Sequence, residues 1–388
     1  MSSPDQLVKI LRERHALPQQ WESAVSSVPR ELFLPDTIET GDKVISRASE
    51  PEAWLETVYD DVSITTQVND GLPTDGDEYR LPTSSSSQPS IMLEMLTLLD
   101  VQVGDKVLEL GTGTGLNAAW LAHNLGSQHV TSVEVDQALV AQASKNAEAA
   151  GYQPRIVCGD GALGWPEGAS YDKVIATYAV PAISYAWVQQ APAGRIVAPW
   201  GGSFFPYSFA VLDVQDGRAV GRFTGYPAFM RNRSERPARG YLRDFLHHRD
   251  EAVETRTALS PLDLAHHAEA LFYVGLALPD AWHLAVNAND DSGEVTLWIL
   301  ADDRSSWAAA DYTPDQDTYL VTQYGPRKLW DEAEAAYRVW DQMGRPDRER
   351  AGISVTSDGQ YVWLDTEEQV ISGSPTHAAP MGRPLINR

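Results

Sequence analysis

A glycine-rich turn between a strand and a helix constrains the fold more than any other feature. The stretch VLELGTGTGLNAAWLAH, residues 107–123, runs from a short apolar-acidic strand into an amphipathic helix. Between them lie Gly111, Gly113 and Gly115, which let the backbone approach a ligand closely and aim amide hydrogens at it. We therefore expect a nucleotide-type pocket at the end of this strand.

The same alternation continues along the chain. Short β-branched runs alternate with helical patterns from residue 106 to residue 200, which indicates βα units and a parallel sheet. Two strand-like runs around Asp216-Gly217 then predict a hairpin. The predicted fold class is α/β: a doubly wound, Rossmann-like sheet with a terminal β-hairpin, followed by a C-terminal α+β domain.

The length of 388 residues favours more than one domain. We expect an N-terminal helical segment and a loop over residues 1–90, a cofactor-binding domain over 91–243, and the α+β domain over 244–388. The serine-, glycine- and proline-rich stretch before residue 90 is expected to be a long loop, and Ser90 or a neighbour could cap the next helix. A second hairpin, at Asp358-Gly359, is expected in the C-terminal domain.

Charge and composition exclude several classes of partner. The net charge of −24 argues against nucleic acid binding. No apolar run approaches the roughly 20 residues that span a bilayer, and the N-terminus lacks a signal-peptide core, so a cytoplasmic protein without membrane contact is expected. Cys158, the single cysteine, is expected to be a buried strand thiol. The histidines lack metal-ligand spacing, so no metal is assigned.

Two acids follow the glycine loop at the ends of the next strands. Glu134 lies about 20 residues beyond the loop, where an acid binds ribose hydroxyls. Asp160 and Gly161 end the third strand, and a carboxylate there can accept a hydrogen bond from an adenine amino group. Together these residues describe an adenosine pocket, which fits either NAD or S-adenosylmethionine.

The motifs that follow one another here resemble those of protein-L-isoaspartate O-methyltransferases. The matching stretches are VLELGTGTGLNAAWLA, GDGALGWPEGASYDKVIAT and GRIVAPWG, preceded in order by VPRELFLP, YDDVSIT and SSQPSIM. The resemblance covers about the first 205 residues. It implies a carboxyl O-methyltransferase with S-adenosylmethionine as cofactor and S-adenosylhomocysteine as product. The implied cofactor-binding residues are Glu109, Gly111, Thr112, Gly113, Gly115, Asn117, Glu134, Val135, Asp160, Gly161 and Thr177.

The acceptor side is predicted from the serine run. By its Ser-x-Pro context Ser87 matches the family's active-site serine, with Ser84, Ser85 and Ser86 as looser candidates; the alternative is a capping or flexible loop. The expected substrate-binding residues are Thr83, Tyr226, Phe229, Met230, Arg231 and Arg233. The arginines of the stretch 231–243 could equally pair with the acidic body of the protein.

Two departures from the family pattern bear on the substrate. The chain is longer than the repair enzymes and carries a C-terminal domain, and its serine region reads Ser87-Gln88-Pro89-Ser90 after an expanded segment. Long relatives of this kind resemble methyltransferases of ribosomally made, modified peptides such as lanthipeptides, graspetides and lasso peptides. The favoured prediction is therefore methylation of an L-aspartate in a macrocyclic precursor peptide, with collapse of the ester to an aspartimide. The aspartimide then either persists or is hydrolysed to isoaspartate. The C-terminal domain would then recognise the peptide.

Three alternatives stay open beside that prediction. They are repair of isoaspartyl damage in general proteins, a non-catalytic module that binds S-adenosylmethionine, and a nicotinamide dehydrogenase. The last is disfavoured because the GDG…GW stretch has no role in binding a dinucleotide.

Overall fold

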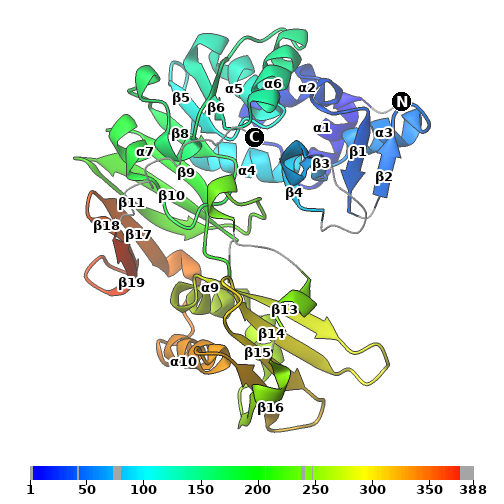
Figure 1. Cartoon of the computed structure of the whole chain (residues 1–388). Helices are drawn as coiled ribbons and strands as arrows, with labels where there is room; N and C mark the ends of the chain where they lie inside the picture. Colours follow the sequence, from blue (N-terminus) through cyan, green and yellow to red (C-terminus); the bar gives the residue numbers. More distant parts are fainter. Residues whose placement is uncertain are drawn as a thin grey trace.

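The protein folds around three β-sheets in the part of the chain that the computed structural model describes, residues 3–41, 43–72, 80–205, 207–236, 241–246 and 248–375. Figure 1 shows the central sheet with the N-terminal sheet on one side and the five-stranded C-terminal sheet below. Short 3₁₀ helices link the elements: η1 Gln19–Trp21, η2 Arg30–Phe33, η3 Asn69–Gly71, η4 Ser127–His129, η5 Gly161–Leu163, η6 Pro166–Gly168, η7 Arg233–Glu235, η8 Leu242–Asp244, η9 Arg249–Glu251 and η10 Arg348–Arg350.

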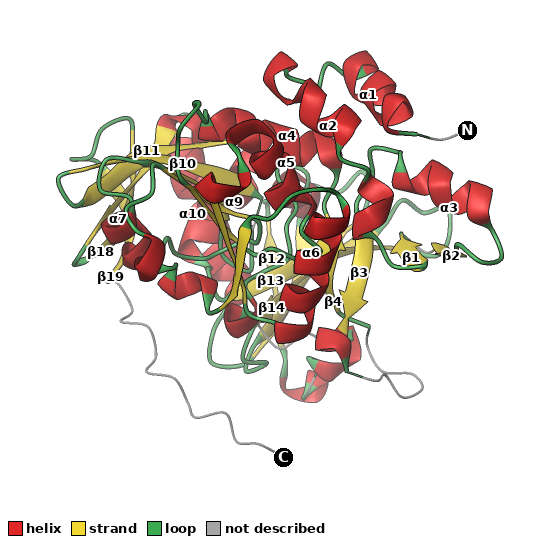
Figure 2. Cartoon of the chain, turned by 90° about the horizontal axis from the view of Figure 1, so that it is seen from above, coloured by secondary structure: helices red, strands yellow, loops and turns green. Residues whose placement is uncertain are grey.

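The N-terminal region combines helices with a small antiparallel sheet. Its helices are α1 Pro4–Glu13, α2 Glu22–Ser27 and α3 Pro51–Val58, and its strands, in spatial order, are β2 Lys43–Ser46, β1 Thr37–Thr40, β3 Ile64–Val68 and β4 Pro82–Ser86. In Figure 2 these elements lie on the side of the molecule opposite β10 and β11.

The serine run is a strand, which corrects the prediction of a loop. In β4, Ser86 pairs with Ile64 and Ser85 with Thr65 of the antiparallel strand β3. Local hydrophobicity does not predict polar β-strands of this kind, because pairing with a neighbouring strand stabilises them rather than their own composition. The expanded segment at residues 73–79 lies outside the described residues.

The central sheet confirms the doubly wound fold. Five of its strands are parallel. In spatial order they are β9 Arg195–Trp200, β8 Lys173–Ala176, β5 Val107–Leu110, β6 Val130–Glu134 and β7 Arg155–Cys158. The helices that connect or flank these strands are α4 Pro89–Leu99, α5 Leu116–Leu125, α6 Gln137–Ala149 and α7 Tyr185–Gln190. The predicted hairpin is formed by β10 Ser208–Gln215 and β11 Arg218–Thr224, with Asp216 and Gly217 both at positive φ.

Two local predictions in this region are wrong. Ser90 does not cap α4, which begins at Pro89; instead its amide donates to the Asp61 carboxylate at 2.8 Å. Cys158 is exposed rather than buried, because β7 is the edge strand of the sheet and Cys158 stands at its carboxyl end.

The C-terminal segment contributes to two different sheets. One is an antiparallel sheet whose strands, in spatial order, are β12 Val253–Thr257, β16 Tyr319–Tyr324, β15 Trp307–Tyr312, β14 Val295–Ala301 and β13 Ala281–Asn287. Helices α8 Pro261–Ala265 and α10 Leu329–Gln342 pack against this sheet, and α9 Ala268–Ala277 packs against α10. The hairpin of β17 Ala351–Thr356 and β18 Gly359–Leu364 turns as predicted. With β19 Val370–Pro375, however, it returns to β11 and extends the central sheet to ten strands.

Aromatic side chains join the C-terminal domain to the central sheet. The ring of Phe272 on α9 lies 5.2 Å from Phe223 and 6.2 Å from Trp200, centroid to centroid. Both units therefore share one hydrophobic core. Trp307, Trp330, Trp340 and Trp363 are buried, and Trp298 is partly buried.

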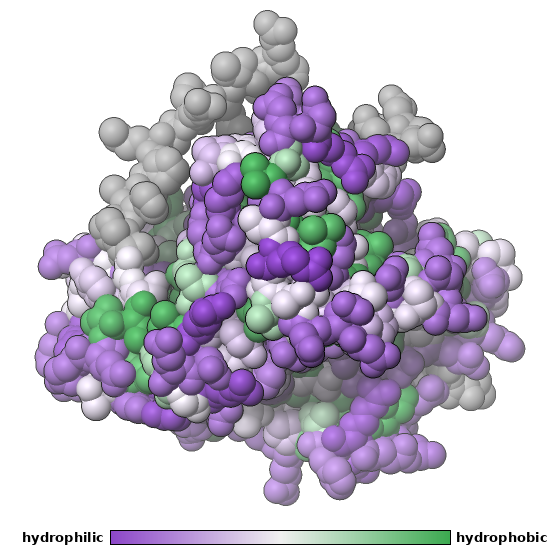
Figure 3. Space-filling model, turned by 90° about the horizontal axis from the view of Figure 1, so that it is seen from below, coloured by the Kyte–Doolittle hydropathy of each residue, from purple (hydrophilic) through white to green (hydrophobic). Residues whose placement is uncertain are grey.

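One face of the molecule is largely hydrophilic. Seen from below, it presents mainly hydrophilic side chains, with apolar ones gathered on one side and a few others between them (Figure 3). Among the described residues, no helix combines the length and apolarity needed to cross a membrane.

Candidate active site

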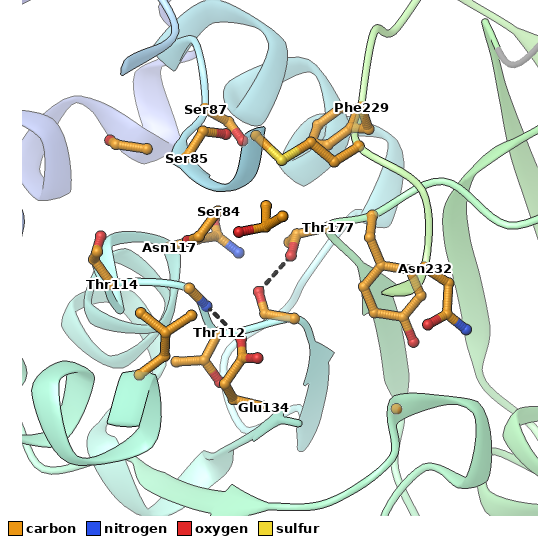
Figure 4. A pocket seen from close by; sticks show the side chains of 18 of the residues that line it. Ser84, Ser85, Ser87, Thr112, Thr114, Asn117, Glu134, Thr177, Phe229 and Asn232 are labelled. Atoms are coloured by element: carbon orange, nitrogen blue, oxygen red, sulfur yellow. Dashed lines mark hydrogen bonds between the residues drawn. The ribbon is translucent and has the colours of Figure 1, made fainter. Parts of the chain in front are cut away.

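A pocket of about 500 Å³ lies at the carboxyl ends of β5 and β6. Three segments supply most of its lining: residues 82–88 of the serine run, the glycine loop at 111–117, and residues 228–236 from the stretch after β11. Figure 4 shows side chains from all three segments facing one cavity. The fold thus unites the predicted cofactor and acceptor sides.

The glycine loop adopts the conformation for which its glycines are needed. Gly111, Gly113 and Gly115 all have positive φ, and a Cβ on Gly111 would lie 2.7 Å from Thr177 Oγ1. Gly111, Thr112 and Gly113 line the pocket. Gly115 does not, because it lies against Ala143 of α6, where it allows close helix packing. Gly115 thus has a packing role, and its predicted role in cofactor binding stays a prediction.

Glu109 lies fully buried at the base of the pocket. Its carboxylate accepts hydrogen bonds from Ser132 and from Asn117 Nδ2, the latter at 2.7 Å. Burial raises the pKa of Glu109 to about 7, against the lowering effect of those hydrogen bonds. Glu109 thereby orients Asn117, whose buried Oδ1 has no hydrogen-bond partner among the described residues.

Glu134 stands at the end of β6 as predicted. Its carboxylate accepts from the amides of Gly113 at 2.9 Å and Asp136 at 3.1 Å, so it ties the glycine loop to the start of α6 (Figure 4). Burial raises the pKa of Glu134 from its ordinary value. Val135 beside it lines the pocket and is half exposed.

Asp160, Gly161 and Thr177 also line the pocket, as predicted. Asp160 accepts from the amide of Ala162 at 2.9 Å, which caps η5. Gly161 packs beneath Tyr178, since a Cβ there would lie 2.3 Å from the tyrosine oxygen. Thr177 donates to the carbonyl oxygen of Gly111 at 2.5 Å and so fixes the loop.

Buried polar atoms without partners show that the pocket fits a polar cofactor. Besides Asn117 Oδ1, the hydroxyl oxygen of Tyr178 and the indole nitrogen of Trp120 are buried without a partner in the described part of the chain, and all three residues line the pocket. Such atoms cost free energy unless a ligand or water satisfies them. The donor and acceptor set suits the amino-acid and nucleoside ends of S-adenosylmethionine.

The four serines line the pocket but differ in their partners. Ser84 accepts from Thr66 at 3.0 Å, and Ser86 accepts from the Arg30 guanidinium at 3.2 Å. The hydroxyls of Ser85 and Ser87 bond to no other described side chain or backbone group and lie near each other in Figure 4. The hydroxyl of Thr83 instead donates a hydrogen bond to the side chain of Gln67, at 2.8 Å.

The predicted substrate-binding residues separate into two groups. Phe229, Met230, Arg231 and Arg233 line the pocket. Tyr226 does not: it is 58% exposed, its hydroxyl donates to Glu269, and the Arg348 guanidinium lies 3.4 Å from its ring centroid. Tyr226 belongs to the junction with the C-terminal domain.

Arg233 and Arg236 line the pocket and are held by three residues that the sequence did not indicate, Gln67, Asp70 and Asp136. Arg233 contacts Asp70 at 3.0 Å and Asp136 at 3.3 Å, and Arg236 contacts Asp70 at 2.8 Å. Gln67 donates to Asp136 at 2.9 Å and accepts from Arg233 at 3.2 Å. We call these five residues the polar clamp. Two of the arginines that could have docked a substrate therefore pair with acids of the protein, the alternative considered from the sequence.

The fold and this pocket together define a class I S-adenosylmethionine-dependent methyltransferase. The glycine turn follows β5 of the parallel sheet, and acids stand at the ends of β6 and β7. The pocket lies at the edge formed by the carboxyl ends of these strands.

The chain belongs to the protein-L-isoaspartate(D-aspartate) O-methyltransferase family, whose model matches residues 2–222. This membership confirms the predicted family, the carboxyl O-methyltransferase class and the cofactor. A relative from Hyperthermus butylicus, a protein-L-isoaspartate O-methyltransferase, is 28% identical over 225 residues, covering 55% of this chain and 81% of that protein. A protein-L-isoaspartate O-methyltransferase 2 from Pelobacter propionicus is 38% identical over 185 residues, covering 47% and 68%.

A solved structure bears on the C-terminal region. It is described as a protein-L-isoaspartate O-methyltransferase, and it matches with a TM-score of 0.52 at 23% identity, covering 94% of this chain and 100% of its own. At this identity the match shows the fold alone. The fold of that structure therefore extends over nearly all of this chain.

Proposed function

We propose that this protein methylates the carboxylate of isoaspartyl residues in proteins or peptides, with S-adenosylmethionine as methyl donor. The single observation that carries the proposal is the pocket itself, in which the cofactor motifs and the serine run face one cavity. The family model, which covers the cofactor motifs and the serine run, supports it. The repair activity, an alternative at the level of sequence, thus becomes the leading candidate.

The chemistry asks for positioning rather than acid–base catalysis. When bound, S-adenosylmethionine supplies an electrophilic methyl group. The acceptor carboxylate, with a reference pKa of about 3.9, is ionised at neutral pH, so one of its oxygens attacks directly and no proton need be removed. In this transfer the S–CH₃ bond would break as the O–CH₃ bond forms, and the electron pair would stay on sulfur.

The residues around the acceptor side suit that task. Ser85 and Ser87 offer hydroxyl donors that can hold one carboxylate oxygen while the other faces the methyl group. Ile91, Met92, Phe229 and Met230 form an apolar wall that displaces water from the carboxylate. Since Arg233 and Arg236 are engaged in the polar clamp, neutral donors rather than these arginines would orient the acceptor.

A second candidate rests on the acceptor segment. The order Ser87-Gln88-Pro89-Ser90 departs from the family pattern where the substrate would bind. This departure favours methylation of an ordinary L-aspartate in a macrocyclic precursor peptide, followed by attack of the next backbone nitrogen, loss of methanol and formation of an aspartimide.

Intact mass spectrometry separates the two candidates. The protein is incubated with S-adenosylmethionine and either an isoaspartyl peptide, its L-aspartyl counterpart, or a macrocyclic aspartyl peptide with its linear form. Gain of one methyl group on the isoaspartyl peptide alone supports the proposal. Methylation and then net loss of water on the macrocycle alone contradicts it and supports the second candidate.

A further inference from the structure

A fully buried arginine lies behind the serine run and takes no part in the chemistry described above. Arg30, on η2, is 1% exposed. Its guanidinium makes no salt bridge with a carboxylate among the described residues. Burying a charge costs free energy unless its hydrogen-bond donors are satisfied. The acceptors that Arg30 binds therefore show which part of the structure it stabilises.

Its partners are two stretches of backbone, one at the end of α3 and the other at the end of β4. On one side Arg30 donates to the carbonyl oxygens of residues 58, 60 and 62, at 3.0, 2.9 and 2.9 Å. On the other it donates to the carbonyl oxygens of Ser86 and Ser87, at 3.3 and 3.2 Å, and to the Ser86 hydroxyl. One planar group thereby fixes the backbone at the end of β4, where the serine run enters α4.

We infer that Arg30 is a positioning residue of the acceptor site, one that holds the Ser86–Ser87 backbone so that the Ser85 and Ser87 hydroxyls face the pocket. The inference rests on the proposed function in so far as these serines hold the acceptor. The hydroxyl of Ser86 is engaged by Arg30. We therefore infer that Ser86 does not bind the acceptor.

The charge of Arg30 persists under working conditions. Burial lowers its pKa to about 10, against the raising effect of Asp61 and Asp60, so the group stays protonated near neutral pH. A lysine would keep the charge but would present a single ammonium that cannot match the planar fork of six contacts. Arg30→Lys therefore tests geometry at constant charge.

The experiment compares Arg30→Lys with Arg348→Lys. Arg348 is a matched control because it is also buried, 2% exposed, donates to the carbonyl oxygen of Tyr207, and lies at the domain junction away from the pocket. For each variant we would measure thermal stability, the Kd for S-adenosylhomocysteine, kcat and KM with a peptide that the wild type methylates, and hydrogen exchange by mass spectrometry.

We expect both variants to lose stability but only Arg30→Lys to lose acceptor turnover. Its kcat/KM should fall about 100-fold, as displacement of a reacting group by an ångström does, while the cofactor Kd stays within about twofold. Amides of residues 84–92 should exchange faster in Arg30→Lys alone. Equal losses of kcat/KM in the two variants, or a parallel loss of cofactor affinity, would overturn the inference.

Failure of the proposed function would look different. The wild type would then methylate no isoaspartyl peptide, whereas exchange at residues 84–92 would still report whether Arg30 holds the segment. Unchanged exchange in Arg30→Lys would refute the positioning role whatever the substrate.

Discussion

Glu109 illustrates how burial sets the behaviour of single residues in this pocket. It accepts hydrogen bonds from Ser132 and Asn117, and burial raises its pKa to about 7. The folded state thus binds its proton more tightly than the unfolded state. The ionised form costs the folded protein free energy, and this cost grows as the pH rises from the ordinary glutamate pKa through 7 and then levels off.

Glu109→Gln should therefore change the pH dependence of stability. The variant stays neutral, so its free energy of unfolding should improve relative to wild type by about 1–3 kcal/mol between about pH 5 and pH 8.5. Urea unfolding of the cofactor-free proteins at both pH values measures this. Glu148→Gln, on the exposed face of α6, serves as control. An equal difference between Glu109→Gln and wild type at both pH values would contradict the account.

Ser87 is the residue at which the acceptor role can be tested most directly. Ser87→Ala should lower kcat/KM for the acceptor peptide by about 10- to 100-fold, because one preorganised hydroxyl donor is lost, and should leave the cofactor Kd unchanged. Steady-state kinetics and calorimetry measure the two quantities, with Ser144→Ala on α6 as control. If Ser85→Ala showed the loss and Ser87→Ala did not, the role would pass to Ser85.

At the scale of elements, the polar clamp joins three parts of the chain beside the pocket. Gln67 and Asp70 come from β3 and η3, Asp136 from the start of α6, and Arg233 and Arg236 from the stretch after β11. That last stretch is also held by the amide of Ala179, which donates to the carbonyl oxygen of Met230 at 2.7 Å. The charge of Arg233 also favours the ionised form of Glu134.

Arg233→Ala should weaken cofactor binding by about tenfold, since a residue that supports the ligand-binding groups is removed and Glu134 becomes easier to protonate. Isothermal titration with S-adenosylhomocysteine measures the effect. Arg243→Ala is the matched control, because Arg243 belongs to the same arginine-rich stretch but its side chain is 77% exposed. The same Kd change in both variants would show that general charge, and not the clamp, is responsible.

At the scale of the whole molecule, the C-terminal segment cannot be regarded as an appendage. Strands β17 to β19 extend the central sheet beyond β11, and the aromatic contacts of Phe272 continue its core into the five-stranded domain. Without β17, β11 would present an unpaired edge, which invites aggregation. The two units should therefore unfold together.

Phe272→Ala tests this cooperativity. Truncating a buried phenylalanine typically costs about 3–5 kcal/mol, and here the loss should shift a single transition of the entire protein. Differential scanning calorimetry measures it, with Val253→Ala on the exposed side of β12 as control. Two separate transitions, of which only one moves, would show that the domains are independent.

Much of the fold and half of the site could be predicted because the relevant signals are local. The alternation of β-branched and helical segments determined the doubly wound sheet. The glycines at 111 and 113, with Glu134 and Asp160 at the ends of the next strands, predicted a pocket at this edge of the sheet, and all four line it. Each signal lies within one strand-turn-helix unit, where a few neighbouring residues decide the backbone conformation.

Only the tertiary structure decided the rest, because strand partners and burial depend on residues far apart in sequence. The serine run is a strand because β3 pairs with it, and Cys158 is exposed because no strand follows β7 in the sheet. The hairpin at Asp358-Gly359 was recognisable, but its place beside β11 was not, since a period of two residues predicts a strand and not its neighbour. Arg30 and the polar clamp likewise act across 28 to 166 positions of sequence, a range at which only packing brings such groups together.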